Sequence, residues 1–242
     1  MSSRNSPADK KAPSASWQSV AVIIDHTNLR PDARPDQIVR LCEEACEFGF
    51  GVVMVNPCHI ALASSNLQNS EVKVGAVVGF PLGATLTSVK TFETKEALKL
   101  GAREIDMVLN IGALKAGNHA LVLSDISGVA DVVREQKALL KVILETGLLA
   151  KEEKLAACEI CEQAGADFVK TCTGFLGGVA TVEDVRLMRD AVRIGVKASG
   201  GIRTASDARA MIDAGASRLG TSSGVNIIRE LWAQTENDAS TR

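Results

Sequence analysis

The chain contains no tyrosine, and its aromatic residues make up only 3% of 242 positions. So few rings leave little material for the stacking platforms with which proteins hold single-stranded nucleic acid. The sequence also lacks a strong charge of either sign, because 27 Lys and Arg oppose 29 Asp and Glu, for a net charge of −2. We therefore expect neither nucleic acid nor an anionic membrane surface as a partner.

Long hydrophobic runs are also missing, since no apolar stretch approaches the roughly 20 residues that a membrane span needs. Residues 1–16 are rich in Ser, Lys and Pro and contain no hydrophobic segment, so we expect a short disordered N-terminal tail and not a signal peptide. The six cysteines do not have the spacing of a small secreted domain, which favours free thiols. Together these absences predict a cytoplasmic protein.

The apolar part of the chain consists of short runs rich in Val and Ile, separated by longer amphipathic segments. The short runs show little alternation between polar and apolar residues, which is typical of parallel strands covered on both faces. The predicted strands are 20–27, 51–56, 73–80, 104–110, 140–146, 167–173, 195–199 and 218–222.

The segments between these strands have helical patterns. In 36–48 the apolar residues recur at helical spacing after Pro35, and a last helix is predicted over 225–232. Thr181 and Thr204 each begin a pattern typical of a capping box. A Gly-Ala pair precedes the fourth, sixth and eighth strands, where glycine suits the end of a helix.

Eight such units in one domain predict an α/β fold, a single (β/α)8 TIM barrel over residues 17–242. A doubly wound sheet is the weaker alternative, because no G-x-G-x-x-G motif follows the first strand and no P-loop occurs.

Charged residues inside predicted barrel strands need an explanation, because barrel interiors favour bulky apolar side chains. They are Asp25, Asp106, Lys141, Glu145, Lys170 and Lys197. Lys170 and Lys197 are one β/α unit apart, so we expect them on neighbouring strands. If both point inward, burial and mutual repulsion would lower a lysine pKa and provide a neutral, nucleophilic amine. The alternative is that these lysines form structural ion pairs with Asp106 and Asp25.

The loops after the last strands are rich in small residues. Gly200 and Gly201 follow the seventh strand, Ser222 and Ser223 follow the eighth, and Gly174 follows the sixth. In barrels of this kind such loops, together with a helix N-terminus, bind phosphate. The sequence therefore predicts a phosphate site at this end of the barrel.

No metal site is expected. Cys158 and Cys161 lie on one arc of a predicted helix, which favours small apolar core positions over ligation. The three histidines, at positions 26, 59 and 119, are too scattered to complete a site.

Two segments carry a family resemblance. Residues 167–174, Asp-Phe-Val-Lys-Thr-Cys-Thr-Gly, resemble the Schiff-base strand of deoxyribose-phosphate aldolases, and residues 196–204, Val-Lys-Ala-Ser-Gly-Gly-Ile-Arg-Thr, resemble the family's second lysine strand and phosphate loop. Further similar segments follow the family's order at 25–27, 55–57, 79–83, 104–110 and 144–147. The resemblance covers nearly all of the predicted barrel.

The resemblance implies a lyase that cleaves 2-deoxy-D-ribose 5-phosphate reversibly to D-glyceraldehyde 3-phosphate and acetaldehyde. Lys170 would form the Schiff base, Lys197 would be the cation that lowers its pKa, and Asp106 would pair with Lys197 and relay protons through water. The 5-phosphate would be held by Gly174, Gly200, Gly201, Ser222 and Ser223, and the sugar hydroxyls or an ordered water by Asp25, Thr27 and Thr173. No cofactor or metal is implied, and homodimers or homotetramers are compatible with the resemblance.

Two departures from the family pattern concern phosphate binding and proton transfer. Some members carry a lysine where this chain has Phe175, and some use a C-terminal tyrosine, which this chain lacks. We therefore expect phosphate binding to rely more on backbone amides, and enamine protonation to rely on water and Asp106. Two alternatives stay open: another phosphosugar barrel enzyme (a different aldolase or an isomerase), and a catalytically silent phosphosugar-binding protein.

Overall fold

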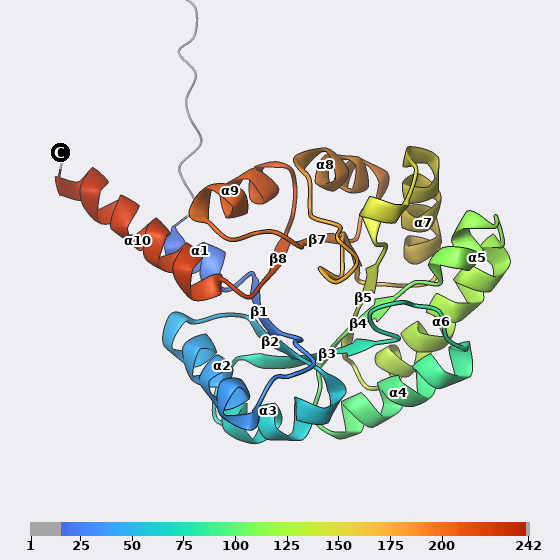
Figure 1. The fold of residues 1–242 in the computed structure, drawn as a ribbon, viewed down its shortest axis with the longest axis horizontal. Helices are drawn as coiled ribbons and strands as arrows, with labels where there is room; N and C mark the ends of the chain where they lie inside the picture. The colour runs from blue at the N-terminus through green and yellow to red at the C-terminus, as the bar shows by residue number, and fades with distance from the viewer. Residues whose placement is uncertain (1–15, 241–242) are drawn as a thin grey trace, which may run out of the picture.

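Eight parallel strands close into a barrel in the computed structural model, which describes residues 16–240, with side chains to residue 236. Each strand pairs with its neighbours in chain order, and the last pairs with the first, so the fold is the predicted (β/α)8 TIM barrel (Figure 1). The strands are β1 (Ile24–Asn28), β2 (Val52–Val55), β3 (Lys73–Val78), β4 (Glu104–Val108), β5 (Leu139–Ile143), β6 (Phe168–Lys170), β7 (Gly195–Ser199) and β8 (Arg218–Thr221). The predicted tail lies outside the described residues except for Ser16, so its boundary stays a prediction.

Helices surround the barrel as an outer layer (Figure 1). They are α1 (Trp17–Ala21), α2 (Pro35–Phe48), α3 (Ile60–Leu67), α4 (Thr87–Lys99), α5 (Ile111–Lys115), α6 (His119–Glu135), α7 (Lys151–Gln163), α8 (Val182–Ala191), α9 (Ala205–Asp213) and α10 (Gly224–Ser240), with 3-10 turns at Pro57–His59 and Thr146–Leu148. Within the described part of the chain, no helix is both long and apolar enough to cross a membrane.

The first predicted strand, 20–27, begins too early. Residues 17–21 form α1 instead, because the Ser16 side chain accepts a hydrogen bond from the Ser19 amide at the helix start. Val20 and Ala21 then bury their side chains in the hydrophobic core. Trp17 stacks on Trp232 of α10, with ring centroids 6.0 Å apart, so α1 lies beside the last helix (Figure 1).

The predicted helix ends are mostly confirmed. Thr204 and Asp207 form a complete capping box, with hydrogen bonds of 2.9 and 3.1 Å between each side chain and the other residue's amide. Thr181 caps α8, but the Asp184 carboxylate pairs with Lys154 of α7 at 2.6 Å and leaves that box incomplete. The glycines of the three Gly-Ala pairs all have positive φ, as expected at helix ends.

Apolar side chains fill the layer between the barrel and its helices. Cys158 and Cys161 are buried there, as the helical pattern predicted. A separate, smaller apolar cluster contains Leu29, Met54 and Val77, with Phe80 packed against it. Val77 stands opposite Asp106 in the β3–β4 register, so this cluster borders the polar interior described below.

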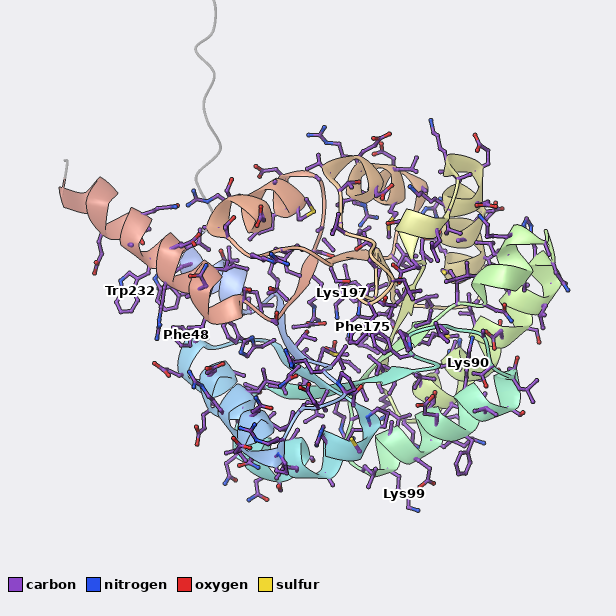
Figure 2. All side chains as sticks on the ribbon, viewed as in Figure 1. Phe48, Lys90, Lys99, Phe175, Lys197 and Trp232 are labelled. Carbon is purple, nitrogen blue, oxygen red and sulfur yellow. The ribbon has the colours of Figure 1, made fainter. Side chains whose placement is uncertain are left out.

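A buried ion pair joins α4 to α6. The Lys90 ammonium donates to Asp125 and to the Val108 carbonyl, at 2.9 Å for the latter, and the Thr87 hydroxyl donates to the other Asp125 oxygen at 2.9 Å. Lys90 is fully buried, whereas Lys99 of the same helix projects from the outer surface (Figure 2). The end of β4 is thus tied to the helical layer by a charge that has no access to water.

Asp125→Ala should lower the free energy of unfolding by about 3–5 kcal/mol, because it leaves the buried Lys90 charge unpaired. Lys99→Ala, which breaks an exposed pair with Glu96, should cost less than about 0.5 kcal/mol. Urea denaturation of both variants measures the difference. Equal losses would contradict a special role for the buried pair.

Candidate active site

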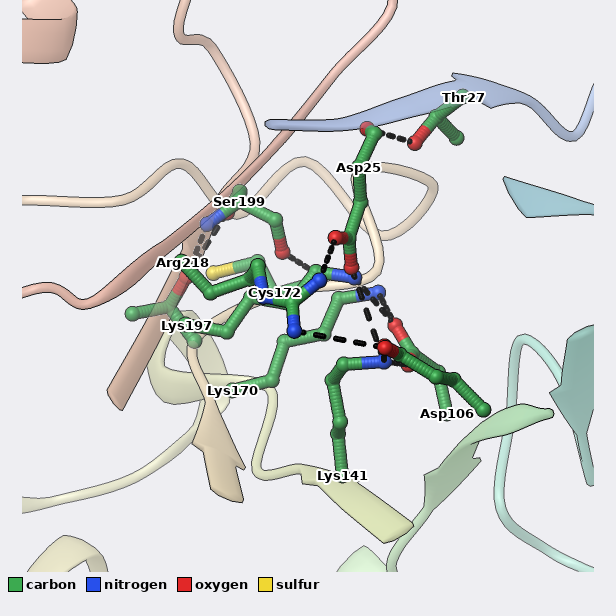
Figure 3. Close-up of polar contacts among 11 residues, drawn as sticks. Asp25, Thr27, Asp106, Lys141, Lys170, Cys172, Lys197, Ser199 and Arg218 are labelled. Carbon is green, nitrogen blue, oxygen red and sulfur yellow. Dashed lines mark hydrogen bonds and ion pairs between the residues drawn. The ribbon is translucent and has the colours of Figure 1, made fainter. Parts of the chain in front are cut away.

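Strand register brings the two predicted lysines side by side. Lys170 on β6 is the direct partner of Lys197 on β7, and Lys197 is in turn the partner of Arg218 on β8. Gly220 on β8 makes room for this arrangement, because a Cβ atom there would lie 2.9 Å from Cε of Lys197. The prediction that the two lysines lie on neighbouring strands is confirmed, and both side chains point into the barrel (Figure 3).

Asp106 on β4 lies at the centre of the polar interior. Its Oδ2 accepts hydrogen bonds from Nζ of Lys170 at 2.8 Å and from Nζ of Lys197 at 2.7 Å. Nζ of Lys141 on β5 donates to the other oxygen at 3.0 Å. Figure 3 shows these lysine side chains converging on the one carboxylate. The predicted pairing of Asp106 with Lys197 is therefore confirmed.

A second layer of charges lies next to these residues. Lys197 also donates to Asp25, whose other oxygen accepts from Nη1 of Arg218 at 2.9 Å (Figure 3). Lys141 pairs with Glu104, and Nη2 of Arg218 lies 3.4 Å from the same carboxylate. Cationic and anionic side chains therefore alternate through the interior. The ion pairs of the lysines with Asp106 and Asp25, which the sequence offered as the alternative to a reactive amine, are also present.

These contacts set different pKa values for neighbouring groups. Burial is the largest influence on Lys170 and lowers its pKa; Asp106 opposes this and Lys197 adds to it, and the resulting pKa is about 8. Burial alone would raise the pKa of Asp106, but the charges of Lys141, Lys170 and Lys197 outweigh burial and hold that pKa well below its usual value. Near pH 7 the resting site therefore contains a charged carboxylate and an amine that loses its proton readily.

A cavity of about 620 Å³ opens above Lys170 at the carboxyl ends of the strands. Of the predicted site residues, the ones that line it are Thr27, Lys170, Thr173, Gly174, Gly200, Gly201 and Ser222. Those that do not line it are Asp25, Asp106, Lys197 and Ser223. The amine of Lys170 is thus the group that the polar interior presents to the cavity.

One wall of the cavity consists of glycine-rich loops. Gly200 and Gly201 have φ of 98° and 78°, a backbone conformation that favours glycine, and added Cβ atoms would press on the β6–α8 loop at 3.1 Å. Ser222 lines the same wall just before the start of α10. The Ser223 amide already has an acceptor within the protein, because it donates to Oγ1 of Thr221 at 2.9 Å.

The cavity has further lining residues, of which Arg203, Arg40 and Glu44 were not identified as site residues from the sequence. Arg203 borders the glycine-rich wall, and among the described residues its guanidinium has no ion-pair partner. Beside β8, where His26 is the register partner of Thr221, the His26 ring contacts Glu44 at 2.8 Å, and Arg40 donates to Glu44 at 2.9 Å. Phe175 packs edge to face on Phe80, with centroids 5.1 Å apart.

Comparisons with known proteins agree with this geometry. Residues 19–234 match the family model for DeoC/LacD family aldolases. The chain belongs to this aldolase family. It is 58% identical over 185 residues to a deoxyribose-phosphate aldolase of Halalkalibacterium halodurans, covering 75% of this chain and 82% of that protein. It is 56% identical over 184 residues to one of Thermococcus gammatolerans, covering 74% and 82%.

A solved structure shows the same aldolase fold. The deoxyribose phosphate aldolase from Aeropyrum pernix, described as having a unique tetrameric structure, superposes with a TM-score of 0.85 at 32% identity. The match covers 90% of this chain and 93% of that one. The family resemblance recognised in the sequence is therefore confirmed.

The low pKa of Lys170 in this family member has a consequence for stability. The folded pKa of about 8 lies below the ordinary value of 10.5, so the unfolded chain binds a proton more tightly than the folded chain does. The resulting cost is fully present below pH 8 and disappears as the pH rises above 10.5, and it amounts to about 3 kcal/mol.

Lys170→Met removes this titration. The unfolding free energy of the wild type should rise relative to that of the variant between pH 8 and pH 10.5, and urea denaturation at several pH values measures the gap. A gap independent of pH would show that the Lys170 pKa is not lowered by folding.

Proposed function

We propose that this chain cleaves 2-deoxy-D-ribose 5-phosphate to D-glyceraldehyde 3-phosphate and acetaldehyde, with Lys170 as the Schiff-base lysine. The observation that carries the proposal is a single lysine amine, with a pKa of about 8, at the floor of the cavity. An amine of this kind is neutral often enough near pH 7 to attack a carbonyl. Membership of the aldolase family and the names of its relatives support the same reaction.

The reaction follows from imine chemistry. Nζ of Lys170 adds to C1 of the open-chain sugar, and loss of water gives a protonated imine. When the C3 hydroxyl loses its proton, the C3–O bond becomes a carbonyl and the electrons of the C2–C3 bond move toward the imine nitrogen. Glyceraldehyde 3-phosphate leaves, and the remaining enamine is protonated at C2. Water then releases acetaldehyde and regenerates the lysine.

Asp106 and Lys197 support these steps without lining the cavity. Oδ2 of Asp106 lies 2.8 Å from the reacting nitrogen, so it can hold a proton transiently as the amine adds and return it as water leaves. Its low pKa keeps this carboxylate charged between steps. Lys197 supplies a nearby positive charge that favours the neutral form of Lys170. We assign exchange with the C3 hydroxyl to a water that contacts Asp106.

Asp25 is fully buried, with its carboxylate bonded to Lys197 and Arg218. We therefore propose that it positions Lys197, and the direct sugar contact expected from the resemblance stays a prediction. Thr27 and Thr173 line the cavity and remain the proposed contacts for the sugar.

The glycine-rich wall is the proposed phosphate site. Gly174, Gly200, Gly201 and Ser222 line it, and Ser223 sits at the start of α10, whose N-terminus favours an anion. Arg203 adds a guanidinium at the same wall, so a charged side chain can compensate for Phe175, which stands where some relatives have lysine. This changes the expectation that backbone amides would dominate.

We also propose that the protein forms a homo-oligomer. Leu86, the residue that caps α4, and Val89 and Phe92 on the helix follow at spacings of three and are 70%, 45% and 65% exposed, and Leu82 lies in the loop before the helix. An apolar stripe of this kind is typical of a surface that another protein covers.

Light scattering coupled to size exclusion measures the oligomeric state. The wild type should be a dimer or a tetramer, and Phe92→Glu should shift it toward the monomer, because a charge would then be buried in the contact. A monomeric wild type would contradict the proposal.

The cytoplasm is the proposed compartment, because all six cysteines are free thiols in the structure. Fractionation of the source cells tests this assignment, and recovery of the protein outside the cytoplasmic fraction would contradict it.

Borohydride trapping tests the proposed reaction most directly. Incubation with 2-deoxyribose 5-phosphate and borohydride at pH 7 should give a stable adduct on Lys170, identified by mass spectrometry. Lys170→Met should give none. Lys197→Leu should lose activity near pH 7, because it removes a charge that lowers the Lys170 pKa, and should recover part of its trapping at pH 9, where more of the amine is neutral.

The alternatives predict different results. An isomerase or a silent phosphosugar-binding protein would bind the substrate without forming an adduct on any lysine. Wild-type activity in Lys197→Leu would mean that Lys197 is only a structural ion-pair partner. Circular dichroism of each variant serves as the control for folding.

A further inference from the structure

Glu145 is a buried carboxylate that the proposed chemistry does not use. It follows β5 and is fully buried, and within the described part of the chain it forms no ion pair. Its Oε2 accepts a hydrogen bond from the Thr173 amide at 3.0 Å. Its Oε1 is buried without a hydrogen-bond partner, and an added Cβ at Gly178 would lie 2.7 Å from it. The carboxylate therefore sits between β5 and the loop that follows β6.

The backbone at Glu145 is strained to place this carboxylate. Its φ of 57° and ψ of 61° are left-handed, a conformation that few residues with a side chain adopt. Lys137, which is exposed, is the other non-glycine residue with positive φ among those the structure describes. Buried strain of this kind persists where the surrounding structure enforces it, and it is concentrated at functional sites.

The segment held by Glu145 reaches the cavity directly. Thr173, Gly174 and Phe175 all line it, and the Phe175 amide donates to Oγ1 of Thr173 at 3.1 Å. Without the bond to Glu145, the Thr173 amide would have no acceptor in this arrangement. The orientation of the next peptide, at Gly174, depends on the same bond.

The position of Lys170 depends on other contacts. The Leu144 amide donates to the Lys170 carbonyl at 2.9 Å, and the Thr146 amide donates to the Thr171 carbonyl at 3.1 Å. Both are bonds between backbone atoms, so they remain when the side chain of Glu145 is changed. The carboxylate can therefore affect the loop without moving the reactive amine.

We propose that Glu145 is a positioning residue whose carboxylate orients the Thr173–Phe175 segment for phosphate binding and so sets the preference for phosphorylated over unphosphorylated sugars. This inference rests on the proposed function, because it assumes that the phosphate lies at the glycine-rich wall. It goes beyond that function by assigning substrate preference to a residue that does not line the cavity.

Steady-state kinetics on two substrates test the inference. For Glu145→Ala, kcat/KM for 2-deoxyribose 5-phosphate should fall about tenfold through KM, because the hydrogen bond from the Thr173 amide to the Glu145 carboxyl group is lost. Its kcat/KM for 2-deoxyribose, which has no phosphate and meets this segment only through the proposed Thr173 contact, should fall by clearly less. Glu145→Gln should retain most of the preference, since its carbonyl oxygen can still accept from Thr173.

Three further variants distinguish the effect of the Glu145 carboxylate on substrate preference from the effects of backbone strain and of incorrect folding. Glu145→Gly relieves the left-handed backbone but removes the acceptor, so it should behave like Glu145→Ala. Lys137→Gly relieves similar strain far from the cavity and should leave both substrates unchanged. Gly178→Ala presses on Oε1 without altering Glu145 and should reproduce the selective loss, which keeps the inference testable if Glu145→Ala does not fold.

Binding of inorganic phosphate, measured by calorimetry, distinguishes failure of this inference from failure of the proposed function. Weaker phosphate binding in Glu145→Ala supports the inference, even if the wild type shows no imine in the trapping experiment. Equal losses on both substrates, or phosphate binding unchanged in both Glu145→Ala and Gly178→Ala, would overturn it. A loss in Glu145→Gln equal to that in Glu145→Ala would also overturn it, because the acceptor would then not be the cause.

Discussion

The mutual neutralisation of buried charges is the constraint on which this structure depends. The barrel interior holds four cationic side chains, Lys141, Lys170, Lys197 and Arg218, against three carboxylates, Asp25, Glu104 and Asp106. Burying any of them alone would be strongly unfavourable, so each is stable only because the others are present. The four cations outnumber the three carboxylates by one. Burial lowers the pKa of Lys170 most, and the neighbouring charges of Lys197 and Lys141 lower it further, so Lys170 loses its proton readily and becomes reactive.

The architecture separates the two tasks of the site. Strands hold the charged groups, because ladder hydrogen bonds fix β4 to β8 in register and leave little freedom for the lysines. Loops form the cavity wall, where glycines at 200 and 201 let the backbone turn sharply. Glu145 lies at the boundary between the two, since it follows β5 and holds the loop after β6. In barrels it is common that reactive residues lie on rigid strands while the loops contact the ligand.

Predictions of the fold from sequence were correct where a local pattern is compatible with only one kind of structure. Val-rich runs without alternation correspond to strands buried on both faces, and glycine at helix ends corresponds to positive φ. Errors arose where the same residues suit two structures. Val20 and Ala21 could extend a strand, but the Ser16 cap and packing in the core make them helical. Glu145 looked like a strand residue, and its left-handed turn carries no local signal.

Composition and spacing by themselves determined a barrel with two lysines on adjacent strands and loops of small residues after the last strands, because these depend on periods along the chain. Only the tertiary structure decided how the charges pair. Arg218 and Glu104 are more than 100 positions apart in sequence, yet they share the interior with Lys141. Likewise, Arg203, which follows β7, and Thr27, on β1, line one cavity because β8 closes the barrel onto β1. Pairing across a closed barrel is a long-range property: the sequence shows which residues carry charge, and the geometry of closure determines which of them meet.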